Sequence, residues 1–219
     1  MSEDSKFIVG TLTAVGLIVL GVLYFSSTSH NAGEPVVDTP PADASLLVRE
    51  DSQKIVAADD QITIVEFADL ECEACRMAHP ILKQILEDYE GQVNFVFRNF
   101  PFHNNSVLAA KSAEAAGEQG KFWEMHDLLF ENQLEWGEKT TPQTELFLSY
   151  AEELGLDLEA FSAVINSTKY EDKILRDQVD GKALGVDSTP TIFFNGQQLD
   201  GIPTYDELKA LIEAELKLK

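Results

Sequence analysis

Cysteine is almost missing from this chain of 219 residues, which contains two, Cys72 and Cys75. A fold held together by several disulfides is therefore excluded. Lysine and arginine are scarce as well: they number 16 against 38 aspartates and glutamates, and the formal net charge is −22. The phosphates of DNA or RNA would repel such a chain, so we expect no nucleic-acid partner. An excess of acidic residues is typical of a well-solvated surface.

One long hydrophobic run lies near the N-terminus. Phe7 to Phe25 (FIVGTLTAVGLIVLGVLYF) carries no charged residue. At about 1.5 Å per helical residue, a run of this length comes close to the ~30 Å thickness of a bilayer's hydrocarbon core. We therefore expect a transmembrane anchor over residues 7–25. The hydrophobic core of a secretory signal peptide is usually shorter, ~7–15 residues, and a cleaved signal peptide stays open as an alternative because small residues follow Phe25.

Few basic residues flank this run, and they favour one orientation. Lys6 precedes it, and no further lysine or arginine occurs before Arg49. The positive-inside rule then places residues 1–6 in the cytoplasm and the rest of the chain outside. We expect a single-pass protein of the cell membrane whose main domain lies in an extracytoplasmic, oxidising space.

Residues 26–45 are polar, contain Pro35, Pro40 and Pro41, and show no hydrophobic period. This composition is typical of a flexible linker. The remaining residues, 46–219, are enough for one domain with a sizeable core and too few for two.

Hydrophobic periodicity predicts the elements of that domain. Ile62–Phe67 (ITIVEF) and Gln92–Phe100 are typical of buried strands, and Glu73–Tyr89 has helical spacing with Pro80 inside it. Further helices are expected near 106–118, 122–132, 143–154, 157–165 and 170–184.

The C-terminal part predicts a hairpin and a last helix. Thr191–Asp200 contains the turn pair Asn195-Gly196, and Thr204 begins a capping-box pattern, TYDE. The order of elements predicts an α/β fold: a sheet sandwiched by helices, with a helical insertion at about 104–184.

Three kinds of chemistry are considered for the two cysteines in FADLECEACRMAHP, where Cys72 and Cys75 are separated by Glu73 and Ala74. Structural zinc needs four ligands, and beyond these two thiols only His79 is well placed, so we expect no metal site. Covalent haem needs a histidine directly after the second cysteine, where this chain has Arg76. A redox dithiol after a strand and at the start of a helix is the third reading, and it is typical of a thioredoxin-like site.

The predicted position suits thiol–disulfide exchange. Backbone N–H groups and the positive end of the helix dipole stabilise a thiolate at Cys72, which lowers its pKa and makes it both a nucleophile and a leaving group. Cys75, one turn further on, is then the resolving thiol that attacks a mixed disulfide formed at Cys72. Glu66 is an ionisable residue in an apolar strand, and burial would raise its pKa so that it could take a proton from Cys75.

Four stretches together resemble the DsbA-like thioredoxin family: VEFADLECEACRMAHP, FVFRNFPFHNNS, GEQGKFWEMHDLLFEN and GVDSTPTIFFNGQQLDG. The resemblance runs from about Glu50 to Lys219. It implies a thioredoxin fold with an inserted helical domain and an extracytoplasmic thiol–disulfide oxidoreductase that needs no cofactor besides its own disulfide.

The resemblance also implies roles for individual residues. Cys72 is the nucleophile and Cys75 the resolver. Pro190 is a cis-proline facing the disulfide, and Thr189 presents its backbone to an extended substrate segment. The family has an acidic residue at the position of Glu66.

The sequence departs from the best-known oxidants of the family between the cysteines. Those oxidants have Pro and His there, and this chain has Glu73 and Ala74, which we place with Thr189 at the substrate-binding surface. Loss of the imidazole and gain of a carboxylate predict a less stable Cys72 thiolate and a weaker oxidant, to an extent that depends on where Glu73 points.

Three functions follow. The leading one is a membrane-tethered oxidase that accepts electrons from thiols of exported proteins and is re-oxidised by a quinone-linked membrane partner of the DsbB or vitamin K epoxide reductase type. A disulfide reductase or isomerase of the same fold is the second. A redox-inert binding or chaperone module is the third.

Overall fold

The computed structural model describes residues 42–58 and 62–218. Within these ranges no helix combines the length and the apolar character needed to cross a bilayer. The expected anchor at 7–25 and most of the expected linker lie outside the described residues.

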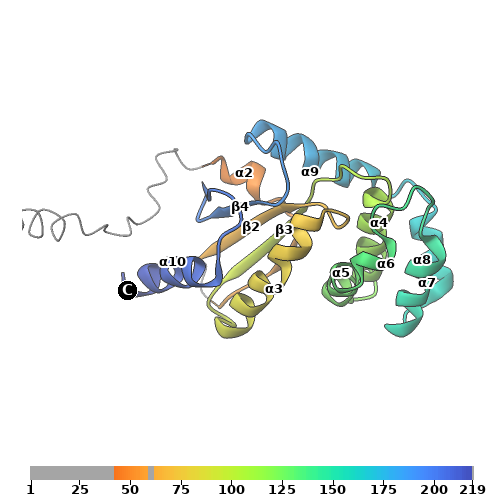
Figure 1. The fold of residues 1–219 in the computed structure, drawn as a ribbon, viewed down its shortest axis with the longest axis horizontal. Coiled ribbons are helices and arrows are strands. Elements are labelled where there is room, and N and C mark those ends of the chain that lie inside the picture. Colours follow the sequence, from red (N-terminus) through yellow and green to blue (C-terminus); the bar gives the residue numbers. More distant parts are fainter. Residues whose placement is uncertain (1–41, 59–61, 219) are drawn as a thin grey trace, which may run out of the picture. The chain divides into compact units, whose positions relative to one another are not determined.

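A five-stranded sheet forms the centre of the described domain (Figure 1). Its strands are β1 (Gln53–Ile55), β2 (Thr63–Ala68), β3 (Asn94–Asn99), β4 (Thr191–Phe194) and β5 (Gln197–Gln198), in the spatial order β1-β3-β2-β4-β5. β2 and β3 are parallel, and the other neighbouring pairs are antiparallel. β2 lies in the middle of the sheet, with a hydrogen-bonded strand on each side, and both its faces are packed in the core.

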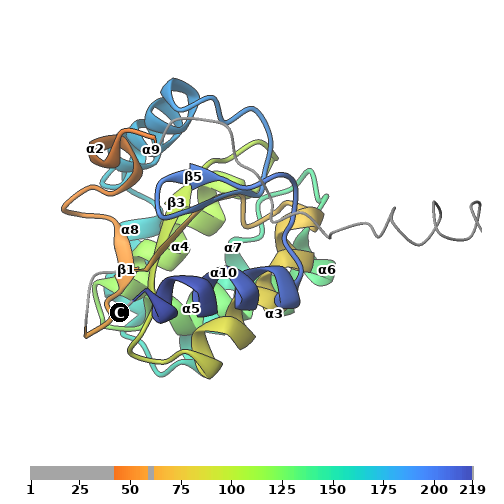
Figure 2. The ribbon, with the colours of Figure 1, turned by 90° about the vertical axis from the view of Figure 1, so that its left-hand side faces the viewer.

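Helices cover both faces of the sheet, and a further group of helices lies beside it. They are α2 (Ala44–Leu47), α3 (Glu73–Asp88), α4 (Ser106–Gly117), α5 (Phe122–Glu131), α6 (Gln133–Trp136), α7 (Thr144–Glu153), α8 (Leu158–Ile165), α9 (Glu171–Ala183) and α10 (Tyr205–Lys217). α3 and α10 pack together on one face, and α2 and α9 pack together on the other (Figures 1 and 2). α4 to α8 form the insertion beside the sheet.

Local sequence explains where several elements begin and turn. Thr204 accepts a hydrogen bond from the Glu207 amide while the Glu207 carboxylate accepts one from the Thr204 amide, so the predicted capping box starts α10. Asn195 and Gly196 have φ of 47° and 82°, the left-handed conformation that a tight hairpin turn between β4 and β5 requires. Gly181 in α9 has no room for a side chain, because a Cβ there would lie 2.7 Å from the Phe100 ring.

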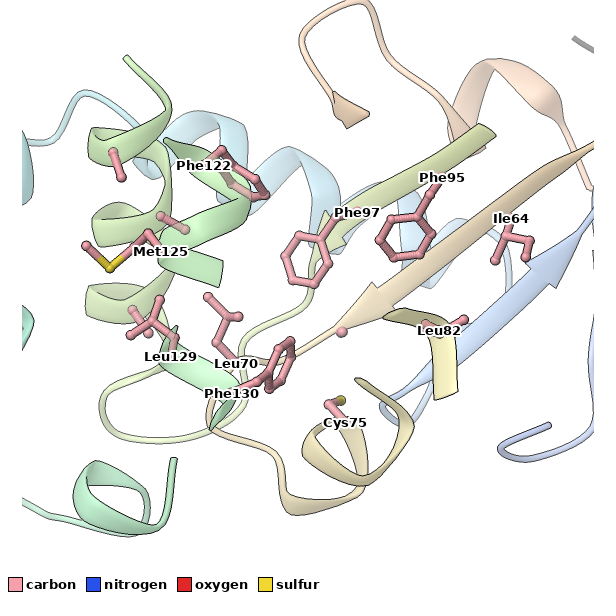
Figure 3. Close-up of a cluster of buried hydrophobic side chains, with 14 of the residues drawn as sticks. Ile64, Leu70, Cys75, Leu82, Phe95, Phe97, Phe122, Met125, Leu129 and Phe130 are labelled. Carbon is pink, nitrogen blue, oxygen red and sulfur yellow. The ribbon is translucent and has the colours of Figure 1, made fainter. Parts of the chain in front are cut away.

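Alternation along β2 divides the core into two clusters. Ile64 and Ala68 point to the α3 side, while Val65 and Phe67 point to the α2 and α9 side. The cluster on the α3 side continues without a break from the sheet into the insertion. Figure 3 shows Phe95 and Phe97 of the sheet near Phe122, Met125 and Leu129 of α5, with Cys75 at its edge.

A buried ion network fastens α9 and α2 to the sheet. Arg98 of β3 is fully buried and donates to Asp177 at 2.8 Å and to Asp180 at 2.7 Å. It also donates to the carbonyls of Leu46 and Leu47, each at 2.7 Å. Asp180 accepts a further pair of hydrogen bonds from Arg49. All of Arg98's charge is thus matched inside the protein.

The predicted α/β fold with a helical insertion is confirmed, and each strand and helix expected within residues 46–219 is present within a few residues of its expected bounds. Three short elements were not predicted: α2, β1 and α6, of three or four residues each. They are too short to show a hydrophobic period.

Candidate active site

The two cysteines lie at the start of α3, directly after the loop that follows β2. Cys72 is the N-cap residue, with extended backbone angles, and is half-buried. Cys75 lies in the first turn and is fully buried. The Arg76 amide donates to the Cys72 carbonyl at 3.1 Å, which closes this turn. Both sulfurs are free thiols, so this is the geometry of the reduced pair.

The surroundings of Cys72 stabilise its thiolate. A hydrogen bond from the Cys75 thiol contributes most, and together with hydrogen bonds from the Thr189 side chain and the backbone amides of Cys75 and Ala74 it lowers the pKa of Cys72 to about 5. Burial acts in the opposite direction and is outweighed. The helix tip therefore holds an ionised sulfur at neutral pH.

The Thr189–Pro190 peptide bond is cis. The Thr189 carbonyl lies 3.4 Å from Cys72 Sγ, although the two residues are 117 positions apart in sequence. A carbonyl oxygen only accepts, so this contact belongs to the thiol form of Cys72, whereas the thiolate attracts the donors named above. The structure thus brings Cys72, Cys75 and Thr189 together at one site, next to Pro190.

Glu66 is buried in the centre of β2, 2% exposed, opposite Phe97 of β3 and Ile192 of β4. Glu66 is two residues from both Ile64 and Ala68 in the strand, so its side chain lies on the same face as theirs, the face that α3 covers. Burial, followed by the negative charge of Cys72, raises the pKa of Glu66 to about 8. Its Oε1 atom has no hydrogen-bond partner among the described residues.

Cys75 is held as a thiol. Burial is the largest cause, and its hydrogen bond to Cys72 and the charges of Glu66 and Cys72 add to it, so the pKa of Cys75 lies well above its usual value. The two sulfurs therefore differ in kind: one is exposed enough to react and ionised, and the other is buried and protonated.

Glu73 points away from the reactive sulfur. Its side chain is 72% exposed and pairs with Arg76, with 3.4 Å between Oε1 and Nη2. Ala74 contributes its backbone amide to the Cys72 sulfur. The carboxylate between the cysteines is thus in solvent beside a compensating guanidinium.

Asp69 and His103, which the sequence does not single out, hold the cysteine loop in place. Asp69 is buried and accepts from the Glu71 amide at 2.9 Å, from the Phe102 amide at 2.7 Å and from His103 Nδ1 at 2.7 Å. Burial lowers the pKa of His103, but the hydrogen bond and charge of Asp69, with the charges of Cys72 and Glu71, raise it overall. An imidazole from another loop is therefore part of the electrostatic field around Cys72.

The insertion also touches the loop directly. Gln133 of α6 donates from Nε2 to the Leu70 carbonyl at 2.7 Å and to the Cys72 carbonyl at 3.0 Å. The buried Glu71 carboxylate accepts from the amides of Asn105, at 2.6 Å, and Glu138, at 3.1 Å. Nothing in the local sequence signals these contacts, because each joins residues more than 30 positions apart.

A sequence profile described as "Thioredoxin" matches residues 57–214, which is well over half of the chain. The chain belongs to the thioredoxin family. The resemblance to its DsbA-like members is supported by a solved structure, oxidised BdbD from Bacillus subtilis. That structure has a TM-score of 0.70 and 26% identity and covers 82% of this chain and 97% of its own.

Curated relatives fall into two groups. The "Probable disulfide bond formation protein D" of Bacillus cereus is 29% identical over 226 aligned residues, 99% of this chain and 100% of the relative. The "Na(+)/H(+) antiporter NhaA 3" of Salinispora tropica is 38% identical over 154 residues, 69% of this chain and 22% of the relative. The chain spans between 22% and 33% of the length of the first curated relatives that it matches.

Proposed function

We propose that this chain is an extracytoplasmic thiol–disulfide oxidoreductase that works as a dithiol oxidase through Cys72 and Cys75. One observation carries the proposal: a half-buried Cys72 whose pKa lies near 5 contacts the backbone before a cis-proline, with a buried, protonated Cys75 behind it. The likeness to a disulfide bond formation protein over nearly the whole of both chains supports the same assignment.

The reaction begins with the oxidised pair. A substrate thiolate attacks Cys72 Sγ, a new S–S bond forms, and the Cys72–Cys75 bond breaks with its electron pair going to Cys75. Cys75 then takes a proton, because its pKa lies well above neutrality. A second substrate thiolate attacks the substrate sulfur of the mixed disulfide and releases Cys72 as a thiolate. The substrate loses two electrons and gains a disulfide, and the pair is left reduced.

The low pKa of Cys72 favours this direction. A thiolate with a pKa near 5 is a good leaving group, and its stability favours the reduced form of the pair, which is what makes an oxidant. Re-oxidation then requires an electron acceptor, and we propose a quinone-linked membrane partner of the DsbB or vitamin K epoxide reductase type.

Glu66 exchanges the proton of Cys75 in this proposal. While Cys72 is a thiolate, its negative charge helps to keep the Glu66 carboxyl protonated. Once Cys72 is bonded to a partner sulfur, that charge is gone and the pKa of Glu66 falls, so the carboxylate becomes available as the base for Cys75. This step belongs to re-oxidation: once the Cys72 thiolate has attacked a disulfide of the re-oxidising partner, Cys75 attacks Cys72 Sγ, restores the Cys72–Cys75 disulfide and releases the partner sulfur as a thiolate.

Substrate approaches along the backbone before Pro190. Thr189 offers its main-chain groups to an extended segment, in the manner of strand addition, and Glu73 and Ala74 form the other side of the contact. We further propose the topology expected from the sequence: residues 1–6 in the cytoplasm, an anchor at 7–25, a linker at 26–45 and the catalytic domain outside the membrane.

Trapping of mixed disulfides tests the exchange activity. In the Cys75→Ala variant of the full-length chain, a mild added oxidant joins Cys72 to a substrate thiol and no Cys75 is present to displace that substrate, so the variant should accumulate mixed disulfides with thiol-containing exported proteins, released by reductant. The matched control is Cys72→Ala: the remaining Cys75 is fully buried and should capture nothing. If Cys75→Ala gives no adducts under mild oxidation, the chain is a redox-inert module.

Direction is tested separately. The oxidised wild-type chain, mixed with a reduced, unfolded protein, should remove two thiols per chain without added oxidant. If it leaves those thiols untouched while the reduced chain opens disulfides, the reductase or isomerase alternative holds.

A further inference from the structure

A cavity of about 430 Å³ lies between α3, α5 and the sheet, and Glu66 is one of the residues that line it. Its inner wall is apolar, formed by residues such as Leu82 of α3 and Phe95 of β3. Its polar lining is concentrated on two helices: His79 and Lys83 on α3, and His126 and Asp127 on α5. The exchange chemistry proposed above does not use these four side chains.

Three of them gather at one point. One ligand atom from each of His79, His126 and Asp127 lies within 4.8 Å of the other two. Asp127 Oδ1 is 3.5 Å from His79 Nε2 and 3.3 Å from His126 Nδ1. Ligand atoms about 2.0–2.2 Å from a tetrahedral metal are separated from one another by roughly 3.3–3.5 Å, so both spacings fit a shared ion.

The imidazoles have nitrogens that the protein does not satisfy. His79 and His126 are 8% and 3% exposed, and the Nε2 atom of each has no hydrogen-bond partner among the described residues. Buried polar atoms normally have a hydrogen-bond partner, so an unpaired one indicates a place where a water molecule, an ion or another ligand binds. The unpaired Nε2 of His79 lies 3.5 Å from Asp127 Oδ1, and the nitrogen of His126 that faces the same oxygen is Nδ1, at 3.3 Å, so the three side chains form an incomplete polar cluster on the wall of the cavity.

Aromatic packing fixes both rings in place. His79 stacks on Phe130 with 5.0 Å between ring centroids, and His126 packs against Phe97 at 4.8 Å and Phe130 at 4.9 Å. The rings therefore lose little freedom on binding a ligand, which is how binding sites are preorganised.

We propose that His79, His126 and Asp127 form a binding site for a divalent transition metal, with zinc the ion that fits best. Two imidazole nitrogens and one carboxylate oxygen suit zinc, and calcium and magnesium prefer oxygen ligands alone. Three protein ligands leave a fourth position, which faces the cavity. A site of this composition binds a water molecule or a small ligand there.

The charges around the cluster favour a cation. Lys83 Nζ lies 2.8 Å from Asp127 Oδ2 and 2.9 Å from Glu131 Oε1, so its positive charge neutralises part of the negative charge of these two carboxylates. The contact uses the second carboxylate oxygen of Asp127 and leaves Oδ1 directed at the imidazoles. Glu87 and Glu90 also line the cavity, and the summed charge of these five groups is negative.

Zinc titration of the full-length chain tests the site. The protein is used in its oxidised form, because a Cys72–Cys75 disulfide removes the thiolates that would otherwise bind metal. We expect one zinc per chain at neutral pH, displaced by a chelator. Cobalt should occupy the same site and give the intense visible absorption of a four-coordinate ion, which a cation held by surface carboxylates does not give.

Variants locate the binding. Asp127→Asn should weaken zinc binding at least tenfold, and His126→Phe, which preserves the aromatic packing, should do the same. Glu131→Gln is the matched control: it removes one negative charge from the same helix and the same lysine contact, and it should leave the affinity within about threefold. Because Asp127 is partly exposed, Asp127→Asn is expected to fold even if His126→Phe does not.

Two results overturn the proposal. One is an oxidised chain that binds no zinc. The other is an affinity for zinc that is the same in wild type and Asp127→Asn, or that Asp127→Asn and Glu131→Gln lower equally. Either pattern would assign the binding to the general acidity of the surface. Trapping by Cys75→Ala does not depend on the metal, so failure of this proposal leaves the exchange function intact.

Discussion

At the scale of single residues, the two sulfurs of one turn are given opposite properties. Cys72 stands at the N-cap, where amide donors and the Cys75 thiol hold its pKa near 5. Cys75, three residues later, is buried behind it, and its pKa is raised. Position within a helical turn, rather than any special residue between the cysteines, separates the half-buried Cys72, whose pKa is lowered, from the buried Cys75, whose pKa is raised.

Alkylation of the reduced chain should reveal this difference. With iodoacetamide, the rate at Cys72 should rise with pH and level off above about pH 6, because the thiolate is the reactive form. The Cys75→Ala variant loses the hydrogen bond that contributes most to the shift, so its midpoint should move upward by about one pH unit or more. A midpoint near 8.5 in the wild-type chain, the value of an unperturbed cysteine, would contradict the proposed nucleophile.

Glu66 should control the pH dependence of resolution. The Glu66→Gln variant should be slower by about tenfold or more in the attack of Cys75 on a mixed disulfide. The rise of the wild-type rate with pH, whose midpoint should lie below 8 because the adduct lacks the Cys72 charge, should disappear in the variant. Rapid-quench measurement of Cys75 attack on a preformed Cys72 adduct gives this rate. An unchanged profile would remove Glu66 from the proton transfer.

Stability gives an independent check on the same carboxyl. Burial raises the folded-state pKa of Glu66 from 4.5 to about 8. The free energy of unfolding is therefore highest below about pH 4.5, where Glu66 is protonated in both the folded and the unfolded state, and this contribution is lost as the pH rises through 8. Gln carries no such penalty. Relative to wild type, Glu66→Gln should therefore gain stability between pH 5 and pH 9, by an amount on the order of a few kcal/mol, as followed by denaturant unfolding.

Much of this site could be predicted from the sequence. The pairing of Cys72 with Cys75 needed no more than their spacing, and Glu66 was conspicuous as an acid in an apolar strand. The cis bond at Pro190 was expected from the family resemblance. His103 and Gln133 could not be predicted, because each reaches the cysteine loop across a distance in sequence that only the completed fold closes.

At the scale of elements, long periodic segments were predictable and short ones were not. α3 spans 16 residues with a clear apolar face, so its pattern is strong. β1 and α6 have three and four residues and owe their conformation to neighbours: β1 pairs with β3, and Trp136 of α6 is fully buried and donates to the Leu129 carbonyl at 2.9 Å. Tertiary contact, not local propensity, makes these elements.

The ion network between β3 and α9 gives a test at this scale. Replacing Arg98 with Met leaves Asp177 and Asp180 buried with too few partners, and such a loss typically destabilises by about 3–5 kcal/mol. Arg49→Met is the matched control: Arg49 binds the same Asp180, but its side chain is 34% exposed, so the loss of stability should be clearly smaller. Equal melting temperatures for the two variants would show that burial of Arg98 does not matter.

At the scale of the whole molecule, the insertion and the sheet act as one unit around the cysteine loop. The hydrophobic cluster runs from β2 and β3 into α5 (Figure 3), and Gln133 and Glu71 tie the loop to the insertion by hydrogen bonds. This support fixes the half-buried Cys72 at the start of α3. The same two layers enclose the cavity with the proposed metal site, which places that site next to the exchange centre without making it part of it.

The equilibrium redox potential of the Cys72–Cys75 pair tests the central claim most directly. A Cys72 pKa near 5 lies between the values of about 7 in thioredoxin and about 3.5 in DsbA. The corresponding potentials are about −270 and −120 mV, so equilibration of the full-length chain with glutathione buffers should give a value between them. A potential at or below about −270 mV would mean that the reduced form gains nothing from its thiolate, and the oxidase account would be contradicted.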